Sequence, residues 1–301
     1  MLHRGRVALA AIAVLAVFVG AHDSFAATGL AFLEIPVGGR ESALGGCGAA
    51  LISGPTSATY NPAAVAFSPR SVALMHTRHF ADTRAQFLGF TVRRGKFAIS
   101  PHYWGTRVAD VEYRTSASRD PISTFDAVSS AVGAAVAYEI NSRFAAGVTG
   151  RYLYQKIHVE SSDGFAMDAG LLARELVSGF TLGLSAQHMG QMSEFASERP
   201  ALPTALRGGA AFERALHNVG SLLVVAEAQA VKDNTPFFRG GIEYRAPDYV
   251  ALRAGYVEGL DAQDVSFGLG FYVKHIRLDY AFIPYKENLG EGHRFSLALN
   301  L

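Results

Sequence analysis

The chain has 301 residues, a formal net charge of +1, and 18% charged against 50% hydrophobic residues. This charged fraction is below the roughly 25% of a typical soluble domain, and a net charge near zero gives no electrostatic basis for binding nucleic acid. One cysteine cannot form an intramolecular disulfide, so other interactions must hold the fold.

The first 26 residues have the pattern of a cleavable secretory signal peptide. His3, Arg4 and Arg6 give a basic start, residues 7–19 are an unbroken apolar run, and small residues precede position 27. The run is shorter than the ~20 residues that span a bilayer, which weakens the alternative of a membrane anchor. A lipid attached at Cys47 is a further alternative, weakened by the charged residues that come before it. The pattern predicts an exported chain.

Residues 32–67 form a stretch rich in glycine and alanine that ends in Asn61-Pro62-Ala63. Proline fixes its own φ, lacks an N–H, and moves the preceding residue out of the helical region. Small residues let backbone pack closely on backbone. We interpret the stretch as a compact segment held inside the fold with a bend at Asn61-Pro62; the alternative is an ordinary N-terminal strand and loop.

From residue 71 onward, apolar and polar residues alternate with a period of two. In residues 276–284, for example, Ile276, Leu278 and Tyr280 alternate with Arg277 and Asp279, which places the two sets on opposite faces of a sheet. A secreted β-sandwich and a transmembrane β-barrel would both alternate in this way. The predicted strands lie near 71–80, 83–93, 96–104, 126–140, 143–160, 164–174, 178–190, 203–214, 219–231, 236–246, 249–257, 263–274, 276–284 and 292–301.

The charges on these strands favour the barrel. One face carries charged residues among glycine, alanine and serine, whereas the other is nearly free of charge through the middle of each strand. A charged Arg or Lys that faces lipid at mid-membrane costs ~2–4 kcal/mol, but in a lumen such residues can pair with one another. We therefore predict an all-β, transmembrane antiparallel barrel of about 14 strands with these lumen charges: Arg151, Arg207, Glu227, Glu243, Arg253, Arg277 and Asp279.

Two stretches bear on the strand count and the wall. Residues 108–114 could be a further strand, but we assign them to an outer loop, 105–125, because an even count lets both ends lie on one side. Pro101 falls in the third strand, where proline removes a ladder donor, and a closed barrel has no edge strand to accommodate it. The ladder should therefore break near Pro101, as a bulge or lateral opening, unless Pro101 lies above the membrane.

Catalytic motifs are absent from the sequence. There is no nucleophile elbow, no phosphate-binding glycine loop and no cysteine–histidine metal cluster. His76 and His79 are three residues apart on a predicted strand, hence on opposite faces, which does not suit a shared metal. We predict a non-enzymatic chain without catalytic, cofactor-binding or metal-binding residues.

The sequence FLEIPVGGRESALGG followed by ATYNPAAVA resembles the N-terminal signature of the PorV/PorQ family of outer-membrane proteins. That family is itself similar to FadL-type barrels, whose N-terminal segment carries a comparable Asn-Pro-Ala and plugs the lumen. LRAGY at 252–256, RLDYAF at 277–282 and HRFSL at 293–297 match the same family, whereas Cys47 and Leu51 depart from its pattern. The resemblance implies a plug at 27–70 before a barrel at 71–301, with the plug motif Phe32, Leu33, Pro36, Gly38, Gly45, Gly46, Asn61, Pro62 and Ala63.

The resemblance implies location and function as expectations. The chain would lie in the outer membrane of a Gram-negative-type cell, in contact with its lipid. Its function would be that of an accessory for type IX-like protein secretion or surface attachment, with secreted cargo proteins or secretion-system components as partners. The alternative is a FadL-like channel for a hydrophobic ligand; a structural barrel or adhesin comes third and an outer-membrane enzyme last.

Overall fold

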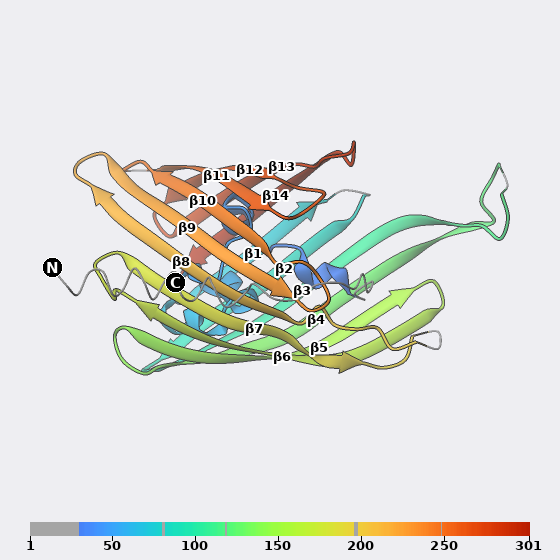
Figure 1. Ribbon diagram of the computed structural model, residues 1–301, viewed down its shortest axis with the longest axis horizontal. Helices are drawn as coiled ribbons and strands as arrows, with labels where there is room; N and C mark the ends of the chain where they lie inside the picture. Colours follow the sequence, from blue (N-terminus) through green and yellow to red (C-terminus); the bar gives the residue numbers. More distant parts are fainter. Residues whose placement is uncertain (1–29, 80–81, 118, 196–197, 248) are drawn as a thin grey trace.

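The computed structural model describes residues 30–79, 82–117, 119–195, 198–247 and 249–301, so the signal-peptide prediction for 1–26 lies outside the described residues. Fourteen antiparallel strands form a closed barrel in which β1 pairs with β14 (Figure 1). No described helix has the length and apolarity of a membrane span. The strands are β1 (Ser71–Arg78), β2 (Arg84–Arg94), β3 (Phe97–Tyr113), β4 (Ser123–Glu139), β5 (Phe144–Ile157), β6 (Glu160–Arg174), β7 (Phe180–Met192), β8 (Ala205–Leu216), β9 (Gly220–Val231), β10 (Phe237–Arg245), β11 (Val250–Glu258), β12 (Val265–Val273), β13 (Ile276–Pro284) and β14 (Glu291–Asn300).

The outer face of the wall is apolar. On β2, Ala85 and Phe87 are buried toward the lumen, while Leu88 and Phe90 are 37% and 43% exposed on the outside. Large apolar side chains are exposed in the same alternating way on all the other strands. A continuous apolar outer band on a closed barrel is the surface that lipid covers. The predicted 14-stranded barrel and its outer-membrane location are therefore confirmed.

Residues 108–113 are not part of an outer loop, so that assignment was wrong. They continue β3 to Tyr113, paired with a β4 that begins at Ser123, and the connection shrinks to residues 114–122. A β-bulge between Val108 and Val111, with Asp110 at φ 57°, bends the strand and lets pairing resume beyond it. The strand count stays at 14, and the β3–β4 hairpin projects past its neighbours (Figure 1).

The two ends of the barrel differ in their connections. Only Gly95 and Lys96 separate β2 from β3, and Gly95 at φ 61° supplies the left-handed conformation of a tight turn. The β7–β8 and β13–β14 connections at the opposite end are longer. Bacterial barrels keep short turns on the periplasmic side and long loops outside. The projecting β3–β4 hairpin is therefore at the extracellular end.

Residues 30–70, the lumenal segment, lie inside the barrel. The segment contains η1 (Ala31–Glu34), α2 (Gly39–Ala43), η2 (Gly54–Thr59) and η3 (Pro62–Phe67). The helix α2 contacts β11 to β14, whereas η3 contacts β3 to β6 on the opposite wall, so the segment crosses the lumen (Figure 1). Asn61 is extended, at φ −150°, and its side chain caps η3 by accepting the N–H of Ala63.

Candidate functional site

The first charge cluster in the lumen joins β10, β11 and β13 to the lumenal segment. Arg253 lies 2.6 Å from Glu243 and 2.9 Å from Asp279, which also pairs with Arg277 at 2.9 Å. Arg40 of α2 donates two hydrogen bonds of 2.9 Å to the Glu243 carboxylate. Burial lowers the pKa of Arg40, but the attraction of Glu243, with smaller contributions from Tyr272 and Glu41, raises it overall above its usual value. The cluster is a buried, alternating chain of charges that includes the segment itself.

The second cluster binds backbone of the segment. Arg207 of β8 pairs with Glu227 of β9 at 2.9 Å. The same carboxylate accepts the N–H groups of Gly48 and Ala49, each at 2.8 Å. Arg239 of β10 donates to the carbonyl of Gly46 at 2.9 Å. Buried backbone groups of a segment without regular structure need such partners, and the wall supplies them.

The third cluster lies on β5, β6 and β7. Arg151 pairs with Asp168 and also donates to the carbonyl of Ala58 at 3.2 Å. A β-bulge in β7 at residues 187–188, with His188 at φ 56°, turns the His188 N–H toward Asp168, 2.9 Å away. The bulge therefore gives the buried Asp168 carboxylate a backbone N–H donor in addition to Arg151. The regular ladder is disrupted at the position where this charge needs that hydrogen bond.

All seven predicted lumen charges therefore face inward and lie in these clusters. Sequence reasoning did not single out Asp168, Arg239 or Arg294, although each occupies the inward phase of its strand. Arg239 is four residues before Glu243 and shares its face, which is the signal that could have found it. Arg294 donates to the carbonyl of Pro36 at 2.8 Å and to the hydroxyl of Ser42 at 2.6 Å.

The glycines of the predicted plug motif lie where backbone meets the wall. A Cβ on Gly45, at φ 73°, would lie 2.8 Å from the carbonyl oxygen of Tyr256, and one on Gly46 would lie 2.9 Å from the Arg239 guanidinium. A Cβ on Gly38 would meet the Glu41 carboxylate of the segment itself. The segment therefore lies too close to β11 to accept a side chain at position 45.

The Asn61-Pro62-Ala63 turn fastens the segment to β6. The Asn61 side chain donates to the carbonyls of Ala49 and Leu171, at 2.8 and 3.0 Å. Asn61, Pro62 and Ala63 are all buried, and a Cβ on Gly170 of β6 would lie 2.1 Å from the Asn61 side-chain oxygen. Asn61 therefore links two stretches of the segment and one strand through a single amide.

An apolar cluster fills the extracellular half of the lumen. Phe32 stacks on Trp104 with ring centroids 6.4 Å apart, and the Trp104 indole donates to the Phe32 carbonyl at 3.2 Å. Leu33 belongs to the same cluster, as do wall residues from several strands. Below it, a cavity of about 20 Å³ lies between Leu33 and Arg151, room for about one water. We call this set the outer apolar cluster; its large members are Leu30, Phe32, Leu33, Val37, Tyr60, Met75, Phe87, Trp104, Leu153, Met192 and Leu202.

Pro101 interrupts the ladder between β2 and β3 without a bulge. Pairing stops after Gly89 with His102 and resumes at Val92 with Ile99 in the same register, so two pairs are missing. Pro101 remains opposite Ala134 of β4 on its other side. The Ser100 hydroxyl donates to the carbonyl of Phe90 at 2.7 Å, a carbonyl that Pro101 has no N–H to reach. The Pro101 side chain is exposed on the outer face.

Reactive groups are few in the described part of the chain. Among the described residues, no group of three His, Cys, Asp or Glu is placed to hold a metal. Cys47 is buried in the lumenal segment, and burial raises the pKa of its thiol. Because the thiolate is the nucleophile, Cys47 is a packing residue at neutral pH.

No family model and no curated protein matches the sequence. Solved structures do match. They include the toluene transporter TbuX of Ralstonia pickettii (TM-score 0.60, 13% identity, 87% of this chain and 96% of that one) and the monoaromatic hydrocarbon channel CymD (0.61, 12%, 88% and 96%). The toluene transporter TodX of Pseudomonas putida matches similarly (0.59, 12%, 87% and 96%). The chain has the fold of these FadL-type barrels.

Proposed function

We propose that this chain is a non-enzymatic outer-membrane channel for hydrophobic small molecules. The outer apolar cluster is the observation that carries the proposal. A water-filled pore has a polar interior, but here Met75, Phe87 and Trp104 turn large apolar side chains inward. A pocket lined by such groups binds an apolar molecule more tightly than a polar one.

The lumenal segment is the plug of this channel. Its Phe32 and Leu33 occupy the centre of the outer apolar cluster, where a hydrophobic cargo molecule would make the same contacts. The cavity beside Leu33 holds about one water, so cargo enters when these two side chains withdraw. The charge clusters below anchor the rest of the segment, so we expect movement to begin at residues 30–37.

The similar solved structures support the class of cargo. TbuX and TodX are described as toluene transporters and CymD as a monoaromatic hydrocarbon channel, and all three are covered almost completely by this fold. Fold does not fix function, so the site must carry the argument. The apolar interior agrees with an uncharged, apolar cargo.

Trp104 provides the test because it is the single tryptophan of the chain. Bromobenzene quenches tryptophan on contact, so a binding site next to Trp104 gives saturable quenching in protein reconstituted into lipid nanodiscs. The control is the double variant Trp104→Phe with Phe90→Trp, which moves the reporter to the lipid-facing side of β2. We expect saturation only in the wild type; the same linear quenching in both proteins contradicts the proposal.

The second candidate is an accessory of type IX-like secretion or surface attachment, as in the PorV/PorQ family. The resemblance of residues 32–67 to that family favours it, and so does the fastening of the segment by Arg40 and Glu227. A barrel that never opens would work through its exterior, and the projecting β3–β4 hairpin offers a surface for cargo or secretion components. Crosslinking from a photoreactive residue at position 112, in intact outer membrane, would capture exported proteins if this candidate is correct.

A further inference from the structure

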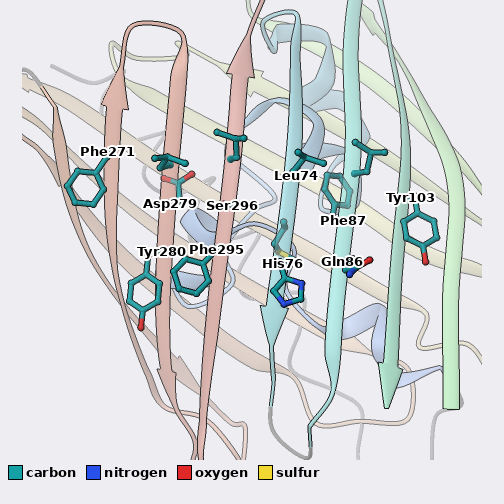
Figure 2. A pocket seen from close by; sticks show the side chains of 14 residues that line it. Leu74, His76, Gln86, Phe87, Tyr103, Phe271, Asp279, Tyr280, Phe295 and Ser296 are labelled. Carbon is teal, nitrogen blue, oxygen red and sulfur yellow. The ribbon is translucent and has the colours of Figure 1, made fainter. Parts of the chain in front are cut away.

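The outer face of the barrel has an apolar hollow beside the seam between β1 and β14. It measures about 720 Å³ and crosses β12, β13, β14, β1, β2 and β3 (Figure 2). Most of its lining side chains face away from the lumen and lie in the lipid-facing band, as the exposure of Leu74, Leu278 and Phe271 shows, whereas Met75, Phe87, Asp279 and Ser296 belong to the inward phase of their strands. The large apolar residues of this external hollow are Leu74, Leu88, Phe271, Leu278, Phe295 and Leu297.

One end of the external hollow is polar. His76 of β1 and Gln86 of β2 are direct cross-strand partners, and both are exposed on the outer face. Neither side chain has a hydrogen-bond partner in the part of the chain that the structure describes. The Tyr103 and Tyr280 hydroxyls point toward the same end (Figure 2). Polar groups at the edge of hydrocarbon need partners, so a ligand here would carry polar atoms at this end.

A row of three arginines lies one outward-facing position beyond His76 and Gln86. Arg78 is the direct partner of Arg84, and Arg84 is the direct partner of Arg107, on three neighbouring strands. All three are exposed on the outer face. Like charges placed directly opposite one another destabilise a sheet. An arrangement that is unfavourable for the barrel alone becomes favourable when an anion lies across it.

The acidic residues nearby compensate this arginine row only in part. Asp82 lies 3.2 Å from Arg78 in a highly exposed pair, and Asp126 pairs with Arg107. Arg84, between them, has no acidic partner among the described residues. Exposed pairs contribute little, so an incoming anion can displace these carboxylates at small cost.

We propose that the arginine row and the external hollow together bind one anionic, phosphate-bearing lipid of the outer leaflet. The phosphate lies on Arg84 between its two neighbours, and one acyl chain runs from His76 into the hollow past Leu74 and Leu88. Guanidinium groups bind phosphate through paired, charge-assisted hydrogen bonds. The charged and apolar parts of the site follow the same order as a lipid of the outer leaflet, because the arginine row is at the extracellular end and the apolar part extends toward mid-membrane. The site lies outside the lumen, so it does not depend on what the barrel transports.

The test compares three probes on delipidated full-length protein in detergent. Phosphatidylglycerol has the charge and the chain, phosphatidylcholine has the chain without net charge, and inorganic phosphate has the charge alone. Native mass spectrometry counts bound lipid. We expect one phosphatidylglycerol per barrel, bound at least about fivefold more tightly than phosphatidylcholine. Both lipids carry the phosphate, but the arginine row repels the choline cation, and fivefold corresponds to about 1 kcal/mol. Equal binding of the two lipids, or displacement of phosphatidylglycerol by an equal concentration of inorganic phosphate, overturns the proposal.

Variants separate the two halves of the site. Arg84→Glu should abolish the preference for phosphatidylglycerol, while Leu88→Trp should weaken both lipids by filling the hollow. The matched control is Lys156→Gln, an exposed cation near the outer end of β5, away from the hollow; it should change nothing. Gel mobility of unboiled protein verifies that each barrel is folded. An unchanged preference in folded Arg84→Glu, or an equal loss in Lys156→Gln, overturns the proposal.

Discussion

Arg40 of the lumenal segment and Glu243 of β10 are 203 residues apart and share two hydrogen bonds of 2.9 Å. The pair is buried, and Glu243 accepts a further bond of 2.6 Å from Arg253. One carboxylate therefore holds two guanidinium groups, one from the segment and one from the wall. Removing it leaves both cations without this partner, so the segment and the barrel are coupled through Glu243.

Replacing Glu243 should loosen the segment. Glu243→Gln leaves Arg40 without a carboxylate partner and Arg253 with Asp279 alone, and breaking such a buried pair costs about 3–5 kcal/mol. Cys47 is the single cysteine and lies in the same segment, so its reaction with a bulky maleimide measures the loosening. We expect slow labelling in wild type and clearly faster labelling in Glu243→Gln.

The pKa of Cys47 explains why labelling of the closed segment is slow. Burial raises that pKa, so the thiol of the closed segment stays protonated at pH 8 and reacts slowly even though a free cysteine would be partly ionised. The control is Glu213→Gln, which breaks an exposed pair with Arg245 and should leave labelling unchanged. Fast labelling of the wild-type barrel in intact cells would show that the segment is accessible.

A second prediction uses two glycines with opposite surroundings. A Cβ on Gly183 of β7 would lie 1.8 Å from the carbonyl oxygen of Ala49, whereas one on Gly150 of β5 has nothing within 4 Å. Gly183→Ala should therefore push the segment off the wall and cost about 1–3 kcal/mol. Gly150→Ala should leave the unfolding temperature within error of wild type. Equal unfolding temperatures for the two variants would contradict the close approach.

The fold could be predicted from the sequence because every strand of a barrel follows the same rule, the alternation of lipid-facing and lumen-facing residues. Alternation fixes which residues face lipid, and the high cost of charge in lipid fixes which face is outside, so Arg277 and Asp279 could be placed by phase alone. The rule contains no information on where a strand stops above the membrane. Residues 108–113 were misassigned for that reason, since a bulge rather than a turn follows Val108.

The candidate functional site could be predicted from the sequence only in part. Phase identified Glu227 as a lumen charge, but not that it binds the backbone of Gly48 and Ala49. Several partners of the lumenal segment come from strands more than 100 residues away, as for Asn61 and Leu171, and no local pattern encodes them. The external hollow was missed because its lining comes from both ends of the barrel sequence and meets only where β1 closes on β14.

A third prediction contrasts the two faces of β13. Asp279→Leu removes the partner of Arg253 and Arg277 inside the lumen and should lower the folded yield by the equivalent of about 3–5 kcal/mol. Leu278→Ala, one residue earlier, changes a side chain that faces lipid and should cost only about 0.5 kcal/mol. The fraction of heat-modifiable barrel on a gel measures both. A larger loss for Leu278→Ala would reverse the assignment of the faces.

The last prediction concerns the interrupted ladder at Pro101. Pro101→Val supplies an N–H that can reach the carbonyl of Phe90, which Ser100 now satisfies, and so should close the two missing pairs between β2 and β3. If hydrophobic cargo leaves the barrel sideways through this interruption, uptake of a hydrophobic fluorescent probe by cells should fall at unchanged protein level. Pro284→Val at the end of β13 also gains a donor and should leave uptake unchanged. Unchanged uptake in Pro101→Val would mean that the interruption is only a local adjustment to proline, and the secretion-accessory candidate would then gain over the channel.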